Sequence, residues 1–103
     1  VIILDHNKFQ SFGRALDHHP ALYPILDKVK AFGYEVDEVD GHNSMEIYDS
    51  IKHRDGKKPL FVIADTIKGK GVSYMENNPI WHYRSPSKKE YAIAISELNK
   101  GLE

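Results

Sequence analysis

The chain has 103 residues, no cysteine and a net charge of −1, because 14 Lys and Arg nearly balance 15 Asp and Glu. This composition allows at most one small domain and excludes a disulfide scaffold and thiolate chemistry. A balanced charge creates no global positive field, so we expect no nucleic-acid partner. No apolar run approaches the roughly 20 residues of a transmembrane helix, so we expect no membrane partner. The lack of cysteine fits a cytoplasmic protein.

The first half of the chain predicts two strands and a helix. Residues 1–4 are continuously apolar, which predicts a strand buried on both faces, as in a parallel sheet. Residues 7–19 lack periodicity and are interpreted as a loop. Apolar side chains then recur at helical spacing after Pro20, so we expect a helix from there to Phe32, ended by Gly33. Residues 34–39 alternate and predict an edge or half-exposed strand.

The second half predicts two more helices around another strand. Residues 40–43 form a turn, in which Asn43 or its neighbour Ser44 caps a helix over about 46–54. Residues 60–64 predict a second fully buried strand. A loop follows to residue 84, and Ser85 or Ser87 caps a last helix that ends at Gly101. Because strands alternate with helices, the sequence predicts an α/β fold, a parallel sheet with crossover helices.

Ligands of parallel sheets bind at the carboxyl ends of the strands, which directs attention to residues 5–10, 40–43 and 65–71. Asn7 follows the first strand and offers an amide oxygen, and the nearby backbone offers more oxygens, a set that suits Mg²⁺. The alternative is structural, because Asx side chains commonly end strands by bonding the local backbone.

Residues 68–71 carry two lysines and two glycines after the second buried strand. Glycines let the backbone approach an anion and lysines supply charge, which would suit phosphate, although a solvated basic turn explains the same residues. His82 follows Trp81 and could donate a hydrogen bond or act as a general acid or base, or it could simply pack under its loop. The adjacent pair His18 and His19 lacks the spacing of a metal site.

Taken in order, these segments resemble the thiamine-diphosphate-binding half of transketolase, and most of all the bacterial forms made as a separate N-terminal subunit. The matching segments are residues 2–10, 31–36, 38–42, 66–78 and 81–82. The resemblance covers essentially the whole chain. It implies that residues 1–103 are the C-terminal part of the diphosphate-binding domain, without the N-terminal part that contains Gly-Asp-Gly. The abrupt start without Met agrees with a segment of a longer protein.

By this resemblance, the cofactors are thiamine diphosphate and Mg²⁺. Asn7 would bind the metal through its side-chain oxygen and Phe9 through its backbone carbonyl. Lys68 and Gly69 would border the diphosphate. His82 would reach the diphosphate and the sugar, as a cofactor-binding and catalytic residue. Where the family often has Gly after this histidine, the chain has Tyr83 and then Arg84, which could pair with a phosphate or face solvent.

The resemblance implies transfer of a two-carbon ketol unit from a ketose phosphate to an aldose phosphate in carbohydrate metabolism, such as the pentose phosphate reactions. The partners would be sugar phosphates and a pyrimidine-binding domain or subunit, in a homodimer or heterotetramer. We expect the 103 residues alone to be inactive. The alternatives are a 1-deoxyxylulose-5-phosphate synthase-like enzyme, which would decarboxylate pyruvate, and a non-catalytic α/β interaction module. Exposed strand edges also predict that the isolated chain associates.

Overall fold

The computed structural model describes residues 1–100, and its centre is a parallel sheet of three strands. These strands are β1 (Ile2–His6), β4 (Glu35–Asp40) and β5 (Leu60–Asp65), arranged in the order β1-β5-β4. Ile2 of β1 and Val36 of β4 both lie opposite Phe61 of the central strand. The predicted α/β class with a parallel sheet is therefore confirmed, and so is the edge position of the strand over 35–40.

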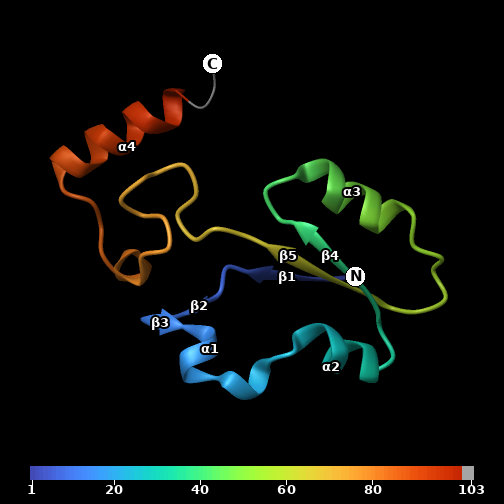
Figure 1. Ribbon diagram of the computed structural model, residues 1–103. Coiled ribbons are helices and arrows are strands. Elements are labelled where there is room, and N and C mark those ends of the chain that lie inside the picture. Colours follow the sequence, from blue (N-terminus) through green and yellow to red (C-terminus); the bar gives the residue numbers. More distant parts are fainter. Residues whose placement is uncertain (101–103) are drawn as a thin grey trace.

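Helices cover both faces of this sheet. In Figure 1, α2 (Ile25–Ala31) lies on one face and α3 (Ser44–Lys52) on the opposite face. The expected cap of α3 is confirmed, because the Oδ1 atom of Asn43 accepts hydrogen bonds from the backbone N–H groups of Met45 and Glu46 at 3.1 and 3.4 Å.

The two continuously apolar strands differ in burial. Leu60 and Val62 of β5 are fully buried, whereas Ile2 and Ile3 of β1 are 44% and 51% exposed. The expectation that residues 1–4 are buried on both faces is therefore wrong. The physical reason is position, since β5 has a neighbour on each side and β1 pairs with β5 alone among the described residues.

The segment after β1 contains more regular structure than the sequence predicts. A small hairpin of β2 (Phe9–Gln10) and β3 (Gly13–Arg14) is followed by α1 (Ala15–His18) and by a 3₁₀ turn, η1 (Pro20–Leu22). The interpretation of 7–19 as a loop is thus wrong for these residues. The expected helix from Pro20 is also too long at its start, because Tyr23 and Pro24 are extended and α2 begins only at Ile25.

The C-terminal part of the described chain lies beside the sheet instead of on it (Figure 1). It consists of a long loop with a 3₁₀ turn, η2 (Pro79–His82), and of α4 (Lys88–Lys100). Of the two predicted caps, Ser85 and Ser87, it is Ser87 that precedes α4, and its Oγ accepts a hydrogen bond from the Glu90 N–H at 3.3 Å. The predicted helix end at Gly101 lies outside the described residues.

The molecule is flat and extended, with a radius of gyration of 16.5 Å. A compact domain of this length has a radius of about 13 Å. Much apolar surface is accordingly open, including four side chains on α4: Tyr91, Ile93, Ile95 and Leu98. Within residues 1–100, no helix has the length and apolar composition needed to cross a membrane.

Candidate active site at the carboxyl edge of the sheet

Three hydrogen bonds join the loops that follow β1, β4 and β5. The Thr66 N–H donates to the carbonyl oxygen of His6 at 3.3 Å, and the Gly41 N–H donates to that of Asp65 at 2.8 Å. The Ile67 N–H donates to the Nε2 atom of His42 at 2.8 Å. The loops selected from the sequence therefore meet at one edge of the sheet, as parallel strand topology requires.

Gly41 allows two of these loops to approach closely. A Cβ atom at this position would lie 2.4 Å from the Cγ2 atom of Thr66 and 3.0 Å from the carbonyl oxygen of Asp65. A larger residue would have to push the loop after β4 away from β5. Gly41 therefore allows the loop after β4 to remain in contact with the end of β5.

Asn7 forms a tight turn at the end of β1. Its Oδ1 atom accepts a hydrogen bond from the Phe9 N–H at 2.9 Å, and Lys8 between them has a left-handed φ of 67°. This is the Asx turn that the structural alternative predicts. An amide oxygen has two lone pairs, so the same atom retains the capacity to bind a cation. The turn also places the backbone of Phe9 directly beside the Asn7 amide.

A cavity of about 590 Å³ lies next to this turn. Its wall includes Asn7 and Phe9 from the turn and hairpin, and His18, Leu22 and Tyr23 from the segment between α1 and α2. Residues 7–24 therefore line an open cavity immediately beyond the end of β1. His19 on this segment pairs with the side-chain oxygen of Gln10 at 3.1 Å.

The hairpin after Asn7 brings His82 to the same side of the molecule. Phe12 at the hairpin tip packs edge-on against the rings of His82 and Tyr83, with centroid separations of 6.2 and 5.2 Å. These are distances and angles of attractive aromatic pairs. Sequence reasoning did not identify Phe12, and only the pairing of β2 with β3 places it there. The structure therefore joins the segment that carries Phe9 to the turn that carries His82.

The loop of Lys68 and Gly69 closes on itself. The carbonyl oxygen of Lys68 accepts from the Asn77 N–H at 2.9 Å, and that of Gly69 accepts from the Val72 N–H at 3.2 Å. Gly69 has a φ of 76°, and a Cβ atom there would lie 2.5 Å from the carbonyl oxygen of Met75. The structure thus gives this glycine a reason other than anion approach, because the turn itself needs the space. Lys68 emerges from this turn with a half-buried side chain.

A polar network that sequence reasoning missed lies between the turn at Asn7 and the end of β5. The Nε2 atom of His6 lies 3.0 Å from the Tyr23 hydroxyl, and Nδ1 lies 3.5 Å from the carboxylate of Asp65. The Lys8 ammonium donates to the same carboxylate at 3.0 Å. The register that places His6 opposite Asp65 is the signal that would have revealed it.

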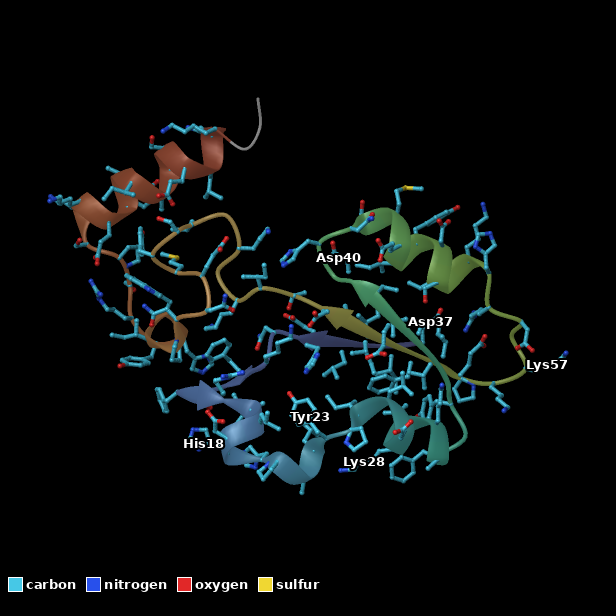
Figure 2. The ribbon with its side chains drawn as sticks, in the orientation of Figure 1. His18, Tyr23, Lys28, Asp37, Asp40 and Lys57 are labelled. Atoms are coloured by element: carbon cyan, nitrogen blue, oxygen red, sulfur yellow. The ribbon has the colours of Figure 1, made fainter. Side chains whose placement is uncertain are left out.

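This network borders a second cavity of about 450 Å³, which is also lined by Glu38 and Asp40 from β4. Figure 2 shows Tyr23 in the segment joining α1 to α2, and Asp40 at the end of β4. Among residues 1–100, no group of three or more His, Cys, Asp or Glu side chains is arranged to hold a metal ion. A metal bound here would therefore also take other oxygens, such as those of the Asn7 turn or of another molecule.

Comparison with known proteins identifies relatives over nearly the whole chain. The 6-deoxy-6-sulfo-D-fructose transketolase subunit of Clostridium sp. (strain MSTE9) is 35% identical over 97% of this chain and 37% of its own length. An apulose-4-phosphate transketolase subunit of Phocaeicola vulgatus is 35% identical over 100% of this chain and 37% of its own length. Human transketolase is 32% identical over 100% of this chain and 16% of its own length.

The chain spans little more than a third of the bacterial subunits that it matches. No family model matches the sequence. The relatives nevertheless agree with one another, since they are transketolase subunits in bacteria and whole transketolases in mammals. The resemblance seen in the motifs is thus confirmed, and over nearly its whole length this chain is a homologue of transketolases and transketolase subunits.

Proposed function

We propose that this chain forms part of the diphosphate-binding domain of a transketolase. The reaction would transfer a two-carbon ketol unit from a ketose phosphate to an aldose phosphate, with thiamine diphosphate and Mg²⁺ as cofactors. The observation that carries the proposal is the 35% identity to a transketolase subunit over 97% of the chain. The contact of Phe12 with His82 supports it, because the two segments proposed to hold the cofactor then lie together.

The Asn7 turn fits the proposed metal. Mg²⁺ prefers oxygen ligands and keeps phosphate and water oxygens in its coordination shell. The Asn7 amide oxygen and the adjacent backbone of Phe9 offer two such oxygens from one turn, and the hydrogen bond between these residues holds that turn in shape. Asn7 and Phe9 would therefore hold the metal, whose charge would balance that of the cofactor's diphosphate.

The cofactor supplies the nucleophilic carbon and the electron sink of ketol transfer. The residues of this chain would bind and orient. Lys68 would attract the diphosphate by its charge, and the turn around Gly69 would form the adjacent wall. His82 would donate a hydrogen bond to the donor sugar or move a proton at one of its oxygens. An exposed position on η2 leaves its imidazole accessible for this role.

Other parts of the enzyme must supply what these residues lack. The sequence contains no Gly-Asp-Gly, so the metal-binding carboxylate of that motif would come from outside it. A pyrimidine-binding domain or subunit would contribute the glutamate that activates the cofactor, in a homodimer or heterotetramer. The names of the bacterial relatives, which are subunits, support a partner subunit. We propose a cytoplasmic enzyme of carbohydrate metabolism, and that residues 1–103 alone do not catalyse the reaction.

The test is ketol transfer by the complete protein with its partner subunit, thiamine diphosphate, Mg²⁺, a ketose phosphate and an aldose phosphate. We expect turnover, and a loss of about a hundredfold or more for His82→Gln if it moves a proton. His53→Gln changes another exposed histidine and serves as the matched control.

Three results would contradict parts of this account. Pyruvate decarboxylation without ketol transfer would identify a deoxyxylulose-phosphate synthase-like enzyme instead. If the complete protein turned over neither the sugar phosphates nor pyruvate, a non-catalytic module would be favoured. Turnover by residues 1–103 alone would show that no other part is needed.

A further inference from the structure

Arg84, for which the sequence left open a phosphate contact or a solvent-facing position, is exposed and also makes two contacts within the chain. Its Nη2 atom donates to both carboxylate oxygens of Glu90 at 2.6 Å. Its guanidinium lies over the indole ring of Trp81, 4.6 Å from the ring centroid. Arginine suits this combination because one planar group forms ion pairs and stacks on aromatic rings at once. The guanidinium of Arg84 therefore has contacts on two sides, one with Glu90 and one with Trp81, while part of its side chain remains exposed.

Glu90 in turn is held at the start of α4. The Ser87 N–H donates to its carboxylate at 2.8 Å, and the Glu90 N–H donates to the Ser87 hydroxyl at 3.3 Å, which completes a capping box. Hydrogen bonding with the Ser87 side chain and backbone, and then with Arg84, lowers the pKa of Glu90 from 4.5 to about 2. The carboxylate is thus ionised at neutral pH and anchored to the helix that Arg84 contacts.

Tyr74 closes the arrangement. Its carbonyl oxygen accepts from the Trp81 indole N–H at 2.9 Å, and its hydroxyl donates to the carbonyl oxygen of Glu90 at 2.8 Å. The rings of Tyr74 and Trp81 also pack at a centroid distance of 5.0 Å. We call Tyr74, Trp81, Arg84 and Glu90 the clamp. Every member touches at least one other member through a hydrogen bond, an ion pair or ring packing.

The clamp and the candidate site share one short turn. Trp81 immediately precedes His82, and Arg84 comes two residues after it. Trp81 contacts Tyr74 and Arg84 contacts Glu90 of α4, whereas His82 and Tyr83 pack against Phe12 of the hairpin. Fixing the residues on both sides of His82 and Tyr83 limits the paths that their backbone can take. The side chains between them then have a defined direction toward the hairpin.

We infer that Arg84 is a positioning residue, which acts through the clamp to hold His82 against the hairpin that carries Phe9. The role of His82 itself rests on the proposed function. The contacts of Arg84 described above involve neither the Asn7 turn nor the loop of Lys68 and Gly69. It would influence the reaction only by fixing where the imidazole of His82 lies, and a misplacement of about 1 Å can cost about a hundredfold in rate.

The structural part of the inference is tested by NMR without any assay of activity. In spectra of the complete protein, Trp81→Phe assigns the indole N–H signal of Trp81, and His82→Gln assigns the His82 ring signals. We expect Arg84→Met to shift both sets of signals and Arg84→Lys to shift them less. Lys89→Met removes an exposed cation next to Glu90 in the first turn of α4 and should shift neither set of signals.

Glu90→Gln is the second variant, because glutamine keeps the capping box while it removes the charge that Arg84 contacts. It should therefore leave the helix content unchanged in circular dichroism and still shift the His82 signals. Unchanged His82 signals in both Arg84→Met and Glu90→Gln would overturn the inference. Shifts confined to Trp81 would overturn it as well, because the clamp would then not reach His82.

The functional part is tested by ketol transfer in the complete protein. We expect Arg84→Met to lower kcat about ten- to a hundredfold. The double variant with His82→Gln should be no worse than His82→Gln alone, since Arg84 acts through that residue. If the loss of kcat in the double variant equalled the product of the two single losses, Arg84 would act independently of His82 and the inference would be overturned. Absence of ketol transfer in the unaltered complete protein would refute the proposed function instead, and the NMR shifts would still decide whether Arg84 positions His82.

Discussion

Strands β1 and β5 have similar sequences and opposite surroundings. Both are short and rich in branched apolar side chains, and they pair with each other over residues 2–6 and 61–65. Leu60 and Val62 of β5 are fully buried, while Ile2 and Ile3 of β1 are about half exposed. An apolar sequence therefore identifies a strand, whereas the number of neighbouring elements within residues 1–100 determines how far its side chains are buried.

Truncating one side chain in each strand gives the largest expected contrast. Leu60→Ala should lower the free energy of unfolding by about 2–5 kcal/mol, because it leaves a cavity where a fully buried side chain begins the central strand. Ile3→Ala should cost about 1 kcal/mol, since roughly half of that side chain is already in water. Urea denaturation of the 103-residue chain measures both values, and equal losses would contradict the difference in burial.

The same contrast between local pattern and surroundings explains which elements were predicted well. Hydrophobic periodicity and turn residues located the three sheet strands and α3 and α4, because local preferences determine these elements. The side-chain cap at Asn43 and the start of α4 after Ser87 were correct for that reason. Residues 7–24 were predicted poorly, because the hairpin and the short helical turns there depend on contacts with distant residues, such as that of Phe12 with Tyr83.

The candidate site divides in the same way. The loops at the ends of β1, β4 and β5 could be selected from the sequence, since parallel topology alone brings them together. The network of His6, Tyr23 and Asp65 could not, because it depends on strand register and on the path of the chain before α2. A partner for Arg84 could not be predicted either, because its ion pair with Glu90 requires the fold of the loop before α4.

The smaller expected effect concerns the association of the isolated chain. An edge strand with exposed apolar side chains invites pairing with another chain, and a lysine on such an edge opposes it. We therefore expect Ile3→Lys to increase the monomer fraction of residues 1–103 at a cost in stability similar to the roughly 1 kcal/mol of Ile3→Ala. Ser96→Lys adds the same charge on an exposed position of α4 and serves as the control.

Analytical ultracentrifugation of the three proteins measures this effect. A monomeric unaltered chain, or equal improvement by both lysine variants, would show that the edge of β1 does not cause association.

The central claim is that the Asn7 turn holds the metal of a cofactor. Its most direct test is calorimetric titration of thiamine diphosphate with Mg²⁺ into the complete protein, comparing the unaltered protein, Asn7→Ala and Asn99→Ala. Asn99 is an exposed amide on α4, far along the chain from the proposed site. We predict that Asn7→Ala weakens binding of the cofactor with Mg²⁺ by about tenfold or more, because even residues that contact a metal ligand indirectly contribute about that much to metal affinity. Asn99→Ala should bind like the unaltered protein. Equal, Mg²⁺-dependent affinity in all three proteins would contradict the claim.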